Sequence, residues 1–94
     1  MIIQIIKLKS SLSEDELLGK ARERKTQFEA IKGLLQKYYV KTEEPGEYGG
    51  IYIWDSPESM QAFRESGLAK SIPQAYETTE APTIDLMNIL FQLR

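Results

Sequence analysis

The chain has 94 residues, of which 41% are hydrophobic and 28% charged, and its net charge is −2. This composition predicts one globular domain over residues 1–94 and argues against a nucleic-acid or acidic-lipid partner. The chain has no cysteine and no histidine, which excludes disulfides, thiolate chemistry, histidine-ligated haem and the usual zinc sites.

The first segment, Ile2–Lys9, is rich in isoleucine and alternates only partly, which predicts a strand buried on both faces. It lacks a basic region and a small-residue cleavage site, so we expect no secretory signal. No apolar run reaches the roughly 20 residues that span a bilayer. We therefore expect no membrane partner and a cytoplasmic location, and the absence of cysteine agrees with that location.

A helix is expected next, because Ser13 and Glu16 form a capping box. The hydroxyl and the carboxylate each accept a hydrogen bond from an orphan amide at the helix start. The helix should run to about Ile31, and Gly33 should end it in the left-handed conformation. Three basic residues are expected on its solvent face: Arg22, Arg24 and Lys25.

Two aromatic-rich runs, Leu34–Thr42 and Tyr48–Trp54, read as strands of a hairpin. Pro45 and Gly46 occupy the central positions of a type II turn between them. A symmetric closure places Tyr39 opposite Tyr52, unless a bulge shifts one strand.

This pairing puts three aromatic side chains on one face of the hairpin: Tyr39, Tyr52 and Trp54. Gly49 and Gly50 weaken the strand where it begins. They indicate a bulge, a close approach of another backbone segment, or room for a ligand.

A second helix begins with Ser56 as N-cap and Pro57 at its first position. We expect Gly67 to close this helix and Ala69–Tyr76 to be irregular, with one helical turn. The last strand is expected over Thr83–Leu93, with apolar side chains on both faces.

The order β-α-β-β-α-β predicts an α+β ferredoxin-like sandwich, a four-stranded antiparallel sheet with the helices on one face. Helices on one side cover only one sheet face, yet several strands are apolar on both. Each such side chain left in water forgoes roughly 1.5–3 kcal/mol. We therefore expect a homodimer in which a second copy covers the open face.

Residues 33–69 also resemble a known family. The resemblance rests on Gly33-Leu34-Leu35-Gln36-Lys37-Tyr38-Tyr39, on Glu47-Tyr48-Gly49-Gly50-Ile51-Tyr52-Ile53-Trp54-Asp55, on Ala62-Phe63-Arg64 and on Leu68-Ala69. These runs look like those of the YdhR-type monooxygenases, which belong to the dimeric α+β barrel superfamily with the antibiotic-biosynthesis monooxygenases. The resemblance implies a homodimer with face-to-face sheets and cofactor-independent oxygenation of a small aromatic or quinol-like compound. The superfamily also contains members that are not oxygenases.

Without flavin, haem or metal, the substrate itself must supply the electrons to oxygen, so the site needs an aromatic pocket and oxyanion donors. We expect Tyr52 and Trp54 to border a pocket on the order of a few hundred Å³. The expected oxygen-binding, catalytic groups are Asn88 and Tyr39, and the expected substrate-binding groups are Tyr52, Trp54, Phe63 and Arg64.

Each of these residues also has a structural interpretation. Trp54 and Phe63 suit core packing, and Tyr39 with Tyr52 suits a cross-strand pair. An amide such as Asn88 in an apolar strand can serve a structural hydrogen bond, and Arg64 can be a solvated helix residue.

Parts of the sequence also suggest three other kinds of function. A carboxylate-only metal site is possible, but the acidic residues lie where helix starts and a turn use them, so we expect no metal. The run Tyr48–Trp54 echoes the aromatic strand of RNA-binding RRM domains, although Glu47 stands where a basic residue is expected. A dimeric small-ligand-binding protein without turnover is the remaining alternative to an oxygenase.

Overall fold

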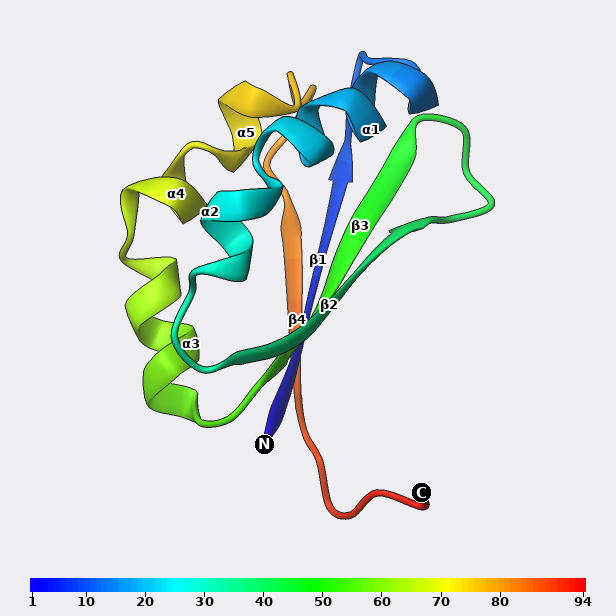
Figure 1. The fold of residues 1–94 in the computed structure, drawn as a ribbon. Helices are drawn as coiled ribbons and strands as arrows, with labels where there is room; N and C mark the ends of the chain where they lie inside the picture. The colour runs from blue at the N-terminus through cyan, green and yellow to red at the C-terminus, as the bar shows by residue number, and fades with distance from the viewer.

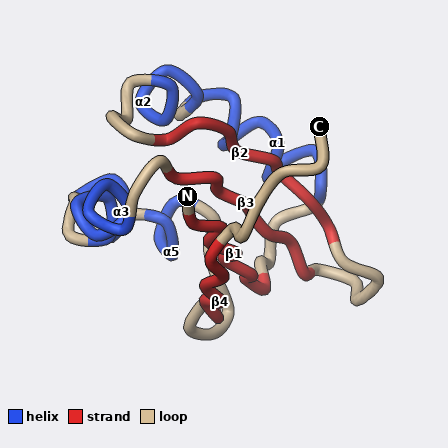
Figure 2. Tube along the Cα trace, turned by 90° about the horizontal axis from the view of Figure 1, so that it is seen from below, coloured by secondary structure: helices blue, strands red, loops and turns tan.

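The computed structural model describes residues 1–94, and its helices lie on one side of a single antiparallel sheet (Figures 1 and 2). The sheet has four strands in the order β2-β3-β1-β4. The strands are β1 (Ile2–Lys9), β2 (Leu34–Lys41), β3 (Glu47–Trp54) and β4 (Thr83–Asn88). The helices are α1 (Glu14–Glu23), α2 (Lys25–Glu29), α3 (Pro57–Arg64), α4 (Gly67–Lys70) and α5 (Ile72–Ala75). The predicted α+β ferredoxin-like fold is confirmed. No helix combines the length and the apolar character that crossing a membrane requires.

Strand β1 lies at the centre of the sheet and alternates strictly in burial. The side chains on its helix-covered face are buried: Ile2, Gln4, Ile6 and Leu8. Those on the opposite face, such as Ile3 and Ile5, are half-buried. The prediction of a strand buried on both faces therefore holds for the helix-covered face, while the other face is only half-buried in the single chain.

The prediction of a single long helix between Ser13 and Ile31 is wrong. The capping box is present, but α1 ends at Glu23 and a separate helix α2 begins at Lys25. Arg24 lies at the break rather than on a solvent face, and its guanidinium donates to the Leu68 carbonyl at 3.3 Å and to Ser71 Oγ at 3.0 Å. These bonds join the break between α1 and α2 to α4 and its C-cap.

Gly33 has the expected left-handed φ of 85°, but it does not close the helix. Helix α2 ends at Glu29, and Gly33 lies in the following turn.

The hairpin turn is as predicted, whereas the pairing is offset by two residues. The Glu47 amide donates to the Glu44 carbonyl at 3.1 Å, and Gly46 has a φ of 78°, as a type II turn requires. Tyr39 pairs with Gly50, and Lys37 takes the place opposite Tyr52. A type II turn does not match the twist of a two-residue hairpin, so the loop is longer and the strands separate earlier. An offset of two leaves every side chain on its expected face.

The second helical region is also divided differently from the prediction. Helix α3 ends at Arg64, and Gly67 opens α4 instead of closing α3, because Ser66 caps α4 by accepting from the Ala69 amide at 3.2 Å. The segment Ala69–Tyr76, expected to be irregular with one helical turn, contains the end of α4 and the one-turn helix α5.

Strand β4 stops at Asn88, well short of the predicted Leu93. Its partner is β1, and the last bond joins the Ile89 amide to the Met1 carbonyl at 3.0 Å. After this bond the C-terminal segment runs away from the sheet (Figure 1). Three of its apolar side chains are 79–91% exposed: Leu90, Phe91 and Leu93.

The core lies between the sheet and the helices, and aromatic rings dominate it. Trp54 is fully buried and stacks on Tyr52 with 6.0 Å between ring centroids. Phe63 from α3 packs against both rings, at 5.3 Å and 5.5 Å. The Trp54 indole donates to Gln4 Oε1 at 3.0 Å, so its one polar atom is satisfied.

Candidate functional site

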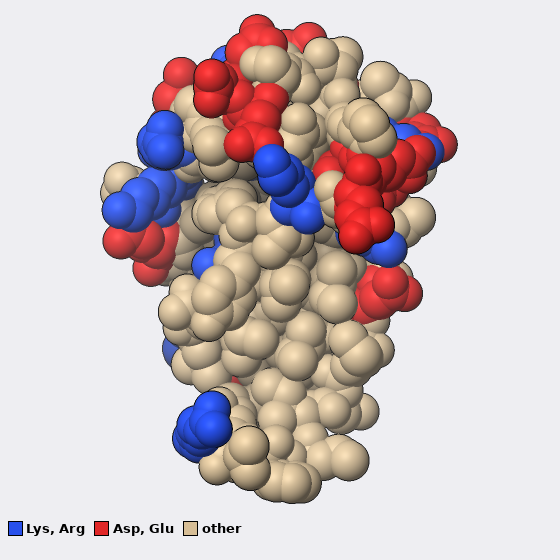
Figure 3. Space-filling view, turned by 90° about the vertical axis from the view of Figure 1, so that its right-hand side faces the viewer, with Lys and Arg blue, Asp and Glu red and all other residues tan.

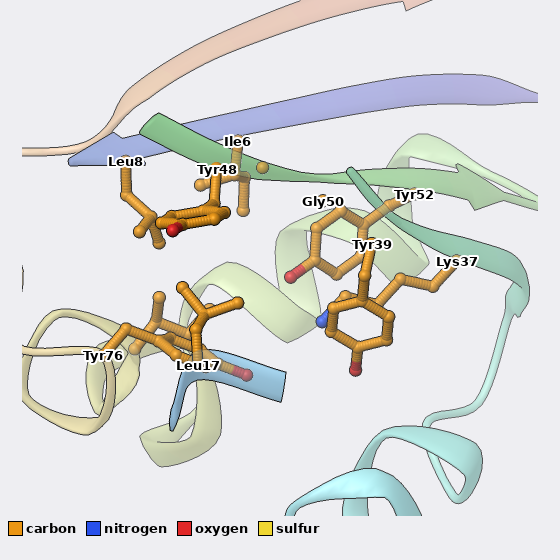
Figure 4. Close-up of a pocket in the computed structure, with 11 residues that line it drawn as sticks. Ile6, Leu8, Leu17, Lys37, Tyr39, Tyr48, Gly50, Tyr52 and Tyr76 are labelled. Atoms are coloured by element: carbon orange, nitrogen blue, oxygen red, sulfur yellow. The ribbon is translucent and has the colours of Figure 1, made fainter. Parts of the chain in front are cut away.

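A cavity lies on the helix side of the sheet, near the hairpin end of β3 (Figure 4). Side chains from the sheet point toward side chains from α1 and from the end of α5. The labelled residues around the cavity are Ile6, Leu8, Leu17, Lys37, Tyr39, Tyr48, Gly50, Tyr52 and Tyr76. Its volume of about 30 Å³ is the room of a single water molecule. The cavity is therefore too small to be a ligand pocket by itself.

The paired glycines of β3 create this space. A Cβ on Gly50 would lie 2.9 Å from the Tyr52 ring and 3.2 Å from Lys37 Cε. A Cβ on Gly49 would lie 2.9 Å from the backbone oxygen of Ile6. Of the three interpretations of the glycine pair, Gly49 therefore fits a close backbone approach, and Gly50 makes room for two side chains of the cavity.

Lys37 is the chemically distinctive group of this cavity. It lies on β2 and extends under the sheet, and its Nζ lies 3.5 Å from the centroid of the Phe28 ring. The rings of Tyr39 and Tyr52 lie 4.3 Å and 4.6 Å from the same atom. The amine makes no hydrogen bond and no ion pair, and no carboxylate lines the cavity. Aromatic faces are its only partners, and they attract a cation.

This enclosure changes the protonation of Lys37. Burial, and to a smaller extent the charge of Arg24, lowers the pKa of the Lys37 amine to about 7. A substantial fraction of this lysine is then neutral at neutral pH. A neutral amine next to hydroxyl groups is able to accept a proton and then hold it as a cation.

The tyrosine hydroxyls around the cavity are shifted the opposite way. Burial raises the pKa of Tyr39 to about 12 and raises the pKa of Tyr52 further. Burial also raises the pKa of Tyr76, whose hydroxyl is buried and has no hydrogen-bond partner. These phenols stay protonated and remain hydrogen-bond donors at neutral pH.

A second cation, Arg24, also lies near the Phe28 ring. The Arg24 guanidinium carbon is 5.7 Å from the centroids of both Phe28 and Tyr76. Its Nη2 atom is anchored to Leu68 and Ser71, while its buried Nε has no partner. Two cations and two unpaired donors thus share one aromatic region without a counter-ion, which is an arrangement suited to an anion.

A wider groove gives Lys37 access to the surface. It runs between α2 and β2, has a volume of about 420 Å³, and is lined by Phe28, Leu34, Lys37 and Tyr39 among others. Sites for small ligands have this scale. Lys37 and Tyr39 line both the groove and the cavity, so these two residues connect the two spaces, and Glu29 is the one carboxylate on the groove wall.

The structure divides the residues that the sequence proposed for a site. Tyr39 and Tyr52 line the inner cavity. Phe63 and Arg64 border a separate cleft of about 300 Å³ next to β4. Asn88 is exposed on the edge strand and borders none of the cavities described.

The prediction that Trp54 borders a cavity of a few hundred Å³ is wrong, because the ring is fully buried among Tyr52, Phe63 and Gln4. The predicted cross-strand pair of Tyr39 and Tyr52 is also wrong, because Lys37 lies opposite Tyr52.

Two residues of the helix face went unnoticed in the sequence. Lys37 alternates with Tyr39 on β2, so it occupies an inward position, and Gln4 occupies one in the isoleucine run of β1. The signal in the sequence is a polar side chain at an inward position of an apolar strand, and the same signal that marks Asn88 also marks Lys37 and Gln4. No three acidic side chains come together in a way that could hold a metal ion.

Solved structures of other proteins share this fold. SnoaB, a cofactor-independent oxygenase from Streptomyces nogalater, matches with a TM-score of 0.76 at 10% identity, over 98% of this chain and 95% of its own. A proposed antibiotic biosynthesis monooxygenase from Deinococcus radiodurans matches with a TM-score of 0.75 at 15% identity, over 100% and 97%. A protein of unknown function from Nitrosomonas europaea matches with a TM-score of 0.78 at 16% identity, over 97% and 90%.

No family model and no curated protein matches the sequence. At these identities the structural likenesses establish the fold alone. The chain therefore has the α+β ferredoxin-like fold found in antibiotic biosynthesis monooxygenases.

Proposed function

We propose that the protein is a cofactor-independent monooxygenase for a small phenolic or quinol-like compound, with Lys37 as its general base. The observation that carries the proposal is the Lys37 amine, enclosed by Phe28, Tyr39 and Tyr52 without any anionic partner. An aromatic groove leads to this amine. The fold shared with SnoaB supports the reaction class.

The first step is removal of a proton from the substrate. A phenol in the groove gives its hydroxyl proton to neutral Lys37, and the resulting ammonium lies beside the phenolate. A phenolate stabilises the buried Lys37 ammonium, which otherwise has only aromatic rings around it. The site therefore favours the charged pair. The phenolate is the electron-rich form that reacts with oxygen.

The second step joins oxygen to the ring and balances without an external reductant. The phenolate delivers two electrons to O₂, a C–O bond forms at the ring carbon para to the oxygen, and a peroxide results. The O–O bond then breaks as the para carbon loses its hydrogen. The products are a quinone and one water, so one phenol consumes one O₂. Protonated Lys37 supplies the proton that the leaving hydroxide needs.

Tyr39 binds the substrate oxygen in this scheme, as the sequence suggested. It lines both groove and cavity, and its raised pKa keeps its hydroxyl a donor. Donors aimed at developing negative charge are a large part of enzymic stabilisation. Trp54 takes no direct part in the scheme. Asn88 has no role in it either, because it is exposed on the edge strand and borders neither the groove nor the cavity.

We also propose the homodimer and YdhR-type membership. Residues 33–69, which carry the YdhR resemblance, form β2, β3 and α3. The open sheet face is largely uncharged, with charged side chains gathered toward the hairpin end (Figure 3). Tyr38 and Met87 on that face are 54% and 50% exposed, and half-buried isoleucines lie between them. A second copy is the simplest cover for this surface.

The dimer is tested by sedimentation at micromolar concentration. We expect twice the chain mass for the natural protein and a single chain mass for Ile5→Glu, which places a charge on the open face. A folded natural protein that sediments as a single chain contradicts the dimer. The cytoplasmic location remains a proposal as well.

Oxygen uptake by purified, chelator-treated protein tests the reaction, with dihydroxy-aromatic or anthrone-like compounds as substrates. We expect uptake without added metal or flavin and a loss of about a hundredfold or more in Lys37→Met, the usual effect of removing a general base. Lys41→Met is the matched control, because Lys41 lies on the same face of β2 but is exposed and paired with Glu14. Dependence on iron or flavin contradicts the mechanism. Tight binding without oxygen uptake favours the alternative of a small-ligand-binding protein.

A further inference from the structure

The buried amide of Gln4 has an unused hydrogen-bond donor. Gln4 is fully buried on β1, between Tyr52 on β3 and Leu86 on β4. Its Oε1 accepts from Trp54 Nε1, while its Nε2 has no partner. The indole nitrogen is a donor only, so the atom that faces it must be the amide oxygen, which fixes the amide orientation. Leaving an amide donor unsatisfied in the interior is costly, so such atoms call for an explanation.

Gln4 lines a cleft that is large enough for a ligand. The cleft has a volume of about 300 Å³ and lies between strands β1 and β4 and helices α3 to α5. Its apolar walls include Phe63, Ile72 and Ile84. Ile6 and Ile72 also line the Lys37 cavity, so these two side chains stand between the two spaces.

The border of the cleft is positively charged. Arg64 and Lys70 both line it, both are exposed, and neither forms an ion pair. No acidic residue lines the cleft. The cleft therefore combines a fully buried amide in its wall, apolar side chains and two cations near solvent, which is a common plan for a small-ligand site.

We propose that this cleft is a second binding site, for a small aromatic carboxylate that also carries a carbonyl oxygen. The carbonyl oxygen accepts from Gln4 Nε2, the ring lies between Phe63 and Ile84, and the carboxylate pairs with Arg64 and Lys70. The site goes beyond the proposed oxygenation and shares no polar group with the Lys37 site. Either proposal can therefore fail while the other stands.

Three benzene derivatives separate the parts of this recognition. 4-Acetylbenzoate carries both the carbonyl and the carboxylate, 4-isopropylbenzoate lacks the carbonyl, and acetophenone lacks the carboxylate. Binding is followed in ¹H–¹⁵N spectra through the Trp54 indole signal, which is the only one because the chain has one tryptophan. The Gln4 side-chain amide signal is followed in the same spectra. Because the two groups are hydrogen-bonded, a ligand on Nε2 shifts both.

We expect 4-acetylbenzoate to bind about tenfold or more tightly than 4-isopropylbenzoate, since only the first satisfies the donor. Acetophenone should bind more weakly than 4-acetylbenzoate as well. Equal affinities of the acetyl and isopropyl compounds overturn the role of Gln4. Spectra in which neither signal moves with 4-acetylbenzoate at millimolar concentration overturn the site.

Two variants test the location without touching the buried amide. Ala69→Phe fills the cleft from α4 and should abolish the shift of both signals. Arg64→Gln should weaken binding several-fold, while Arg22→Gln, an exposed arginine on α1, should not change it. Undiminished binding by folded Ala69→Phe, or an equal loss in both arginine variants, overturns the placement.

Discussion

Strand β3 has two halves on the helix-covered face of the sheet, and they have opposite character. At the Trp54 end, Tyr52, Phe63 and Gln4 surround the indole, which is fully buried and borders none of the cavities described. At the Gly50 end, a missing side chain leaves a cavity, and an unpaired amine projects into it. The indole nitrogen at the first end has a hydrogen-bond partner, whereas the Lys37 amine at the second end has only aromatic rings around it.

The contrast shows where stability and chemistry lie. A full aromatic cluster at one end of the strand stabilises the sheet against the helices. At the other end the chain keeps an unpaired cation and an unpaired tyrosine hydroxyl, both unfavourable for folding. Groups that destabilise the folded state without local compensation are common at functional sites.

The largest expected effect is on stability, at the packed half. Trp54→Ala should lower the free energy of unfolding by about 3–5 kcal/mol, because it opens a cavity in the core. The measurement is urea unfolding, with Trp54→Phe as the conservative variant. Trp54→Phe should retain oxygen uptake. Loss of oxygen uptake in a stable Trp54→Phe protein would mean that Trp54 belongs to the site. It would contradict the contrast between the two ends of β3.

The Gly50 end of β3 should lose stability and activity when a single methyl group is added. Gly50→Ala places a carbon 2.9 Å from the Tyr52 ring and 3.2 Å from Lys37 Cε, so we expect a loss of about 1–3 kcal/mol and lower activity. Gly19→Ala is the matched control. Gly19 lies in α1 with nothing within 4 Å of the added carbon, and alanine should stabilise that helix by about 0.5–1 kcal/mol. Equal effects of the two substitutions would argue against a cavity shaped by Gly50.

A smaller effect is expected in the pH dependence of stability. Lys37 has a folded pKa of about 7 and an unfolded pKa near 10.4, so between these values the unfolded chain binds the extra proton. Stability due to this group is therefore present at high pH and is lost as pH falls toward 7. The slope is at most about 1.4 kcal/mol per pH unit.

Urea unfolding between about pH 7.5 and 9 measures this slope, because tyrosine side chains do not yet ionise in this range. It should be steeper in the natural protein than in Lys37→Met. Parallel curves would mean that the amine is not enclosed.

The strands and the fold class were predictable because the patterns that encode them are local. Isoleucine runs, the Pro45-Gly46 turn and the caps at Ser13 and Ser56 each act within a few residues. The break at Arg24 was not predictable, because the groups that anchor it, Leu68 and Ser71, are far along the chain.

The candidate site was only half predictable for the same reason. Tyr39 and Tyr52 could be placed on one face from alternation alone. The role of Lys37 depends on Phe28, which comes from another element, and on the two-residue offset that puts the amine opposite Tyr52. Alternation with Tyr39 gives the face of Lys37, but the rings that enclose its amine are known only from the register and the contact with Phe28.

The most direct test of the account is the titration of Lys37 itself. In protein labelled with ¹³C at lysine Cε, the shift of each lysine is followed against pH, and Lys37→Met identifies the signal. The account predicts that this lysine titrates at about pH 7 and that substrate binding raises its pKa, since a phenolate then pairs with the ammonium. A Lys37 signal that titrates together with the exposed lysines would contradict the proposed base.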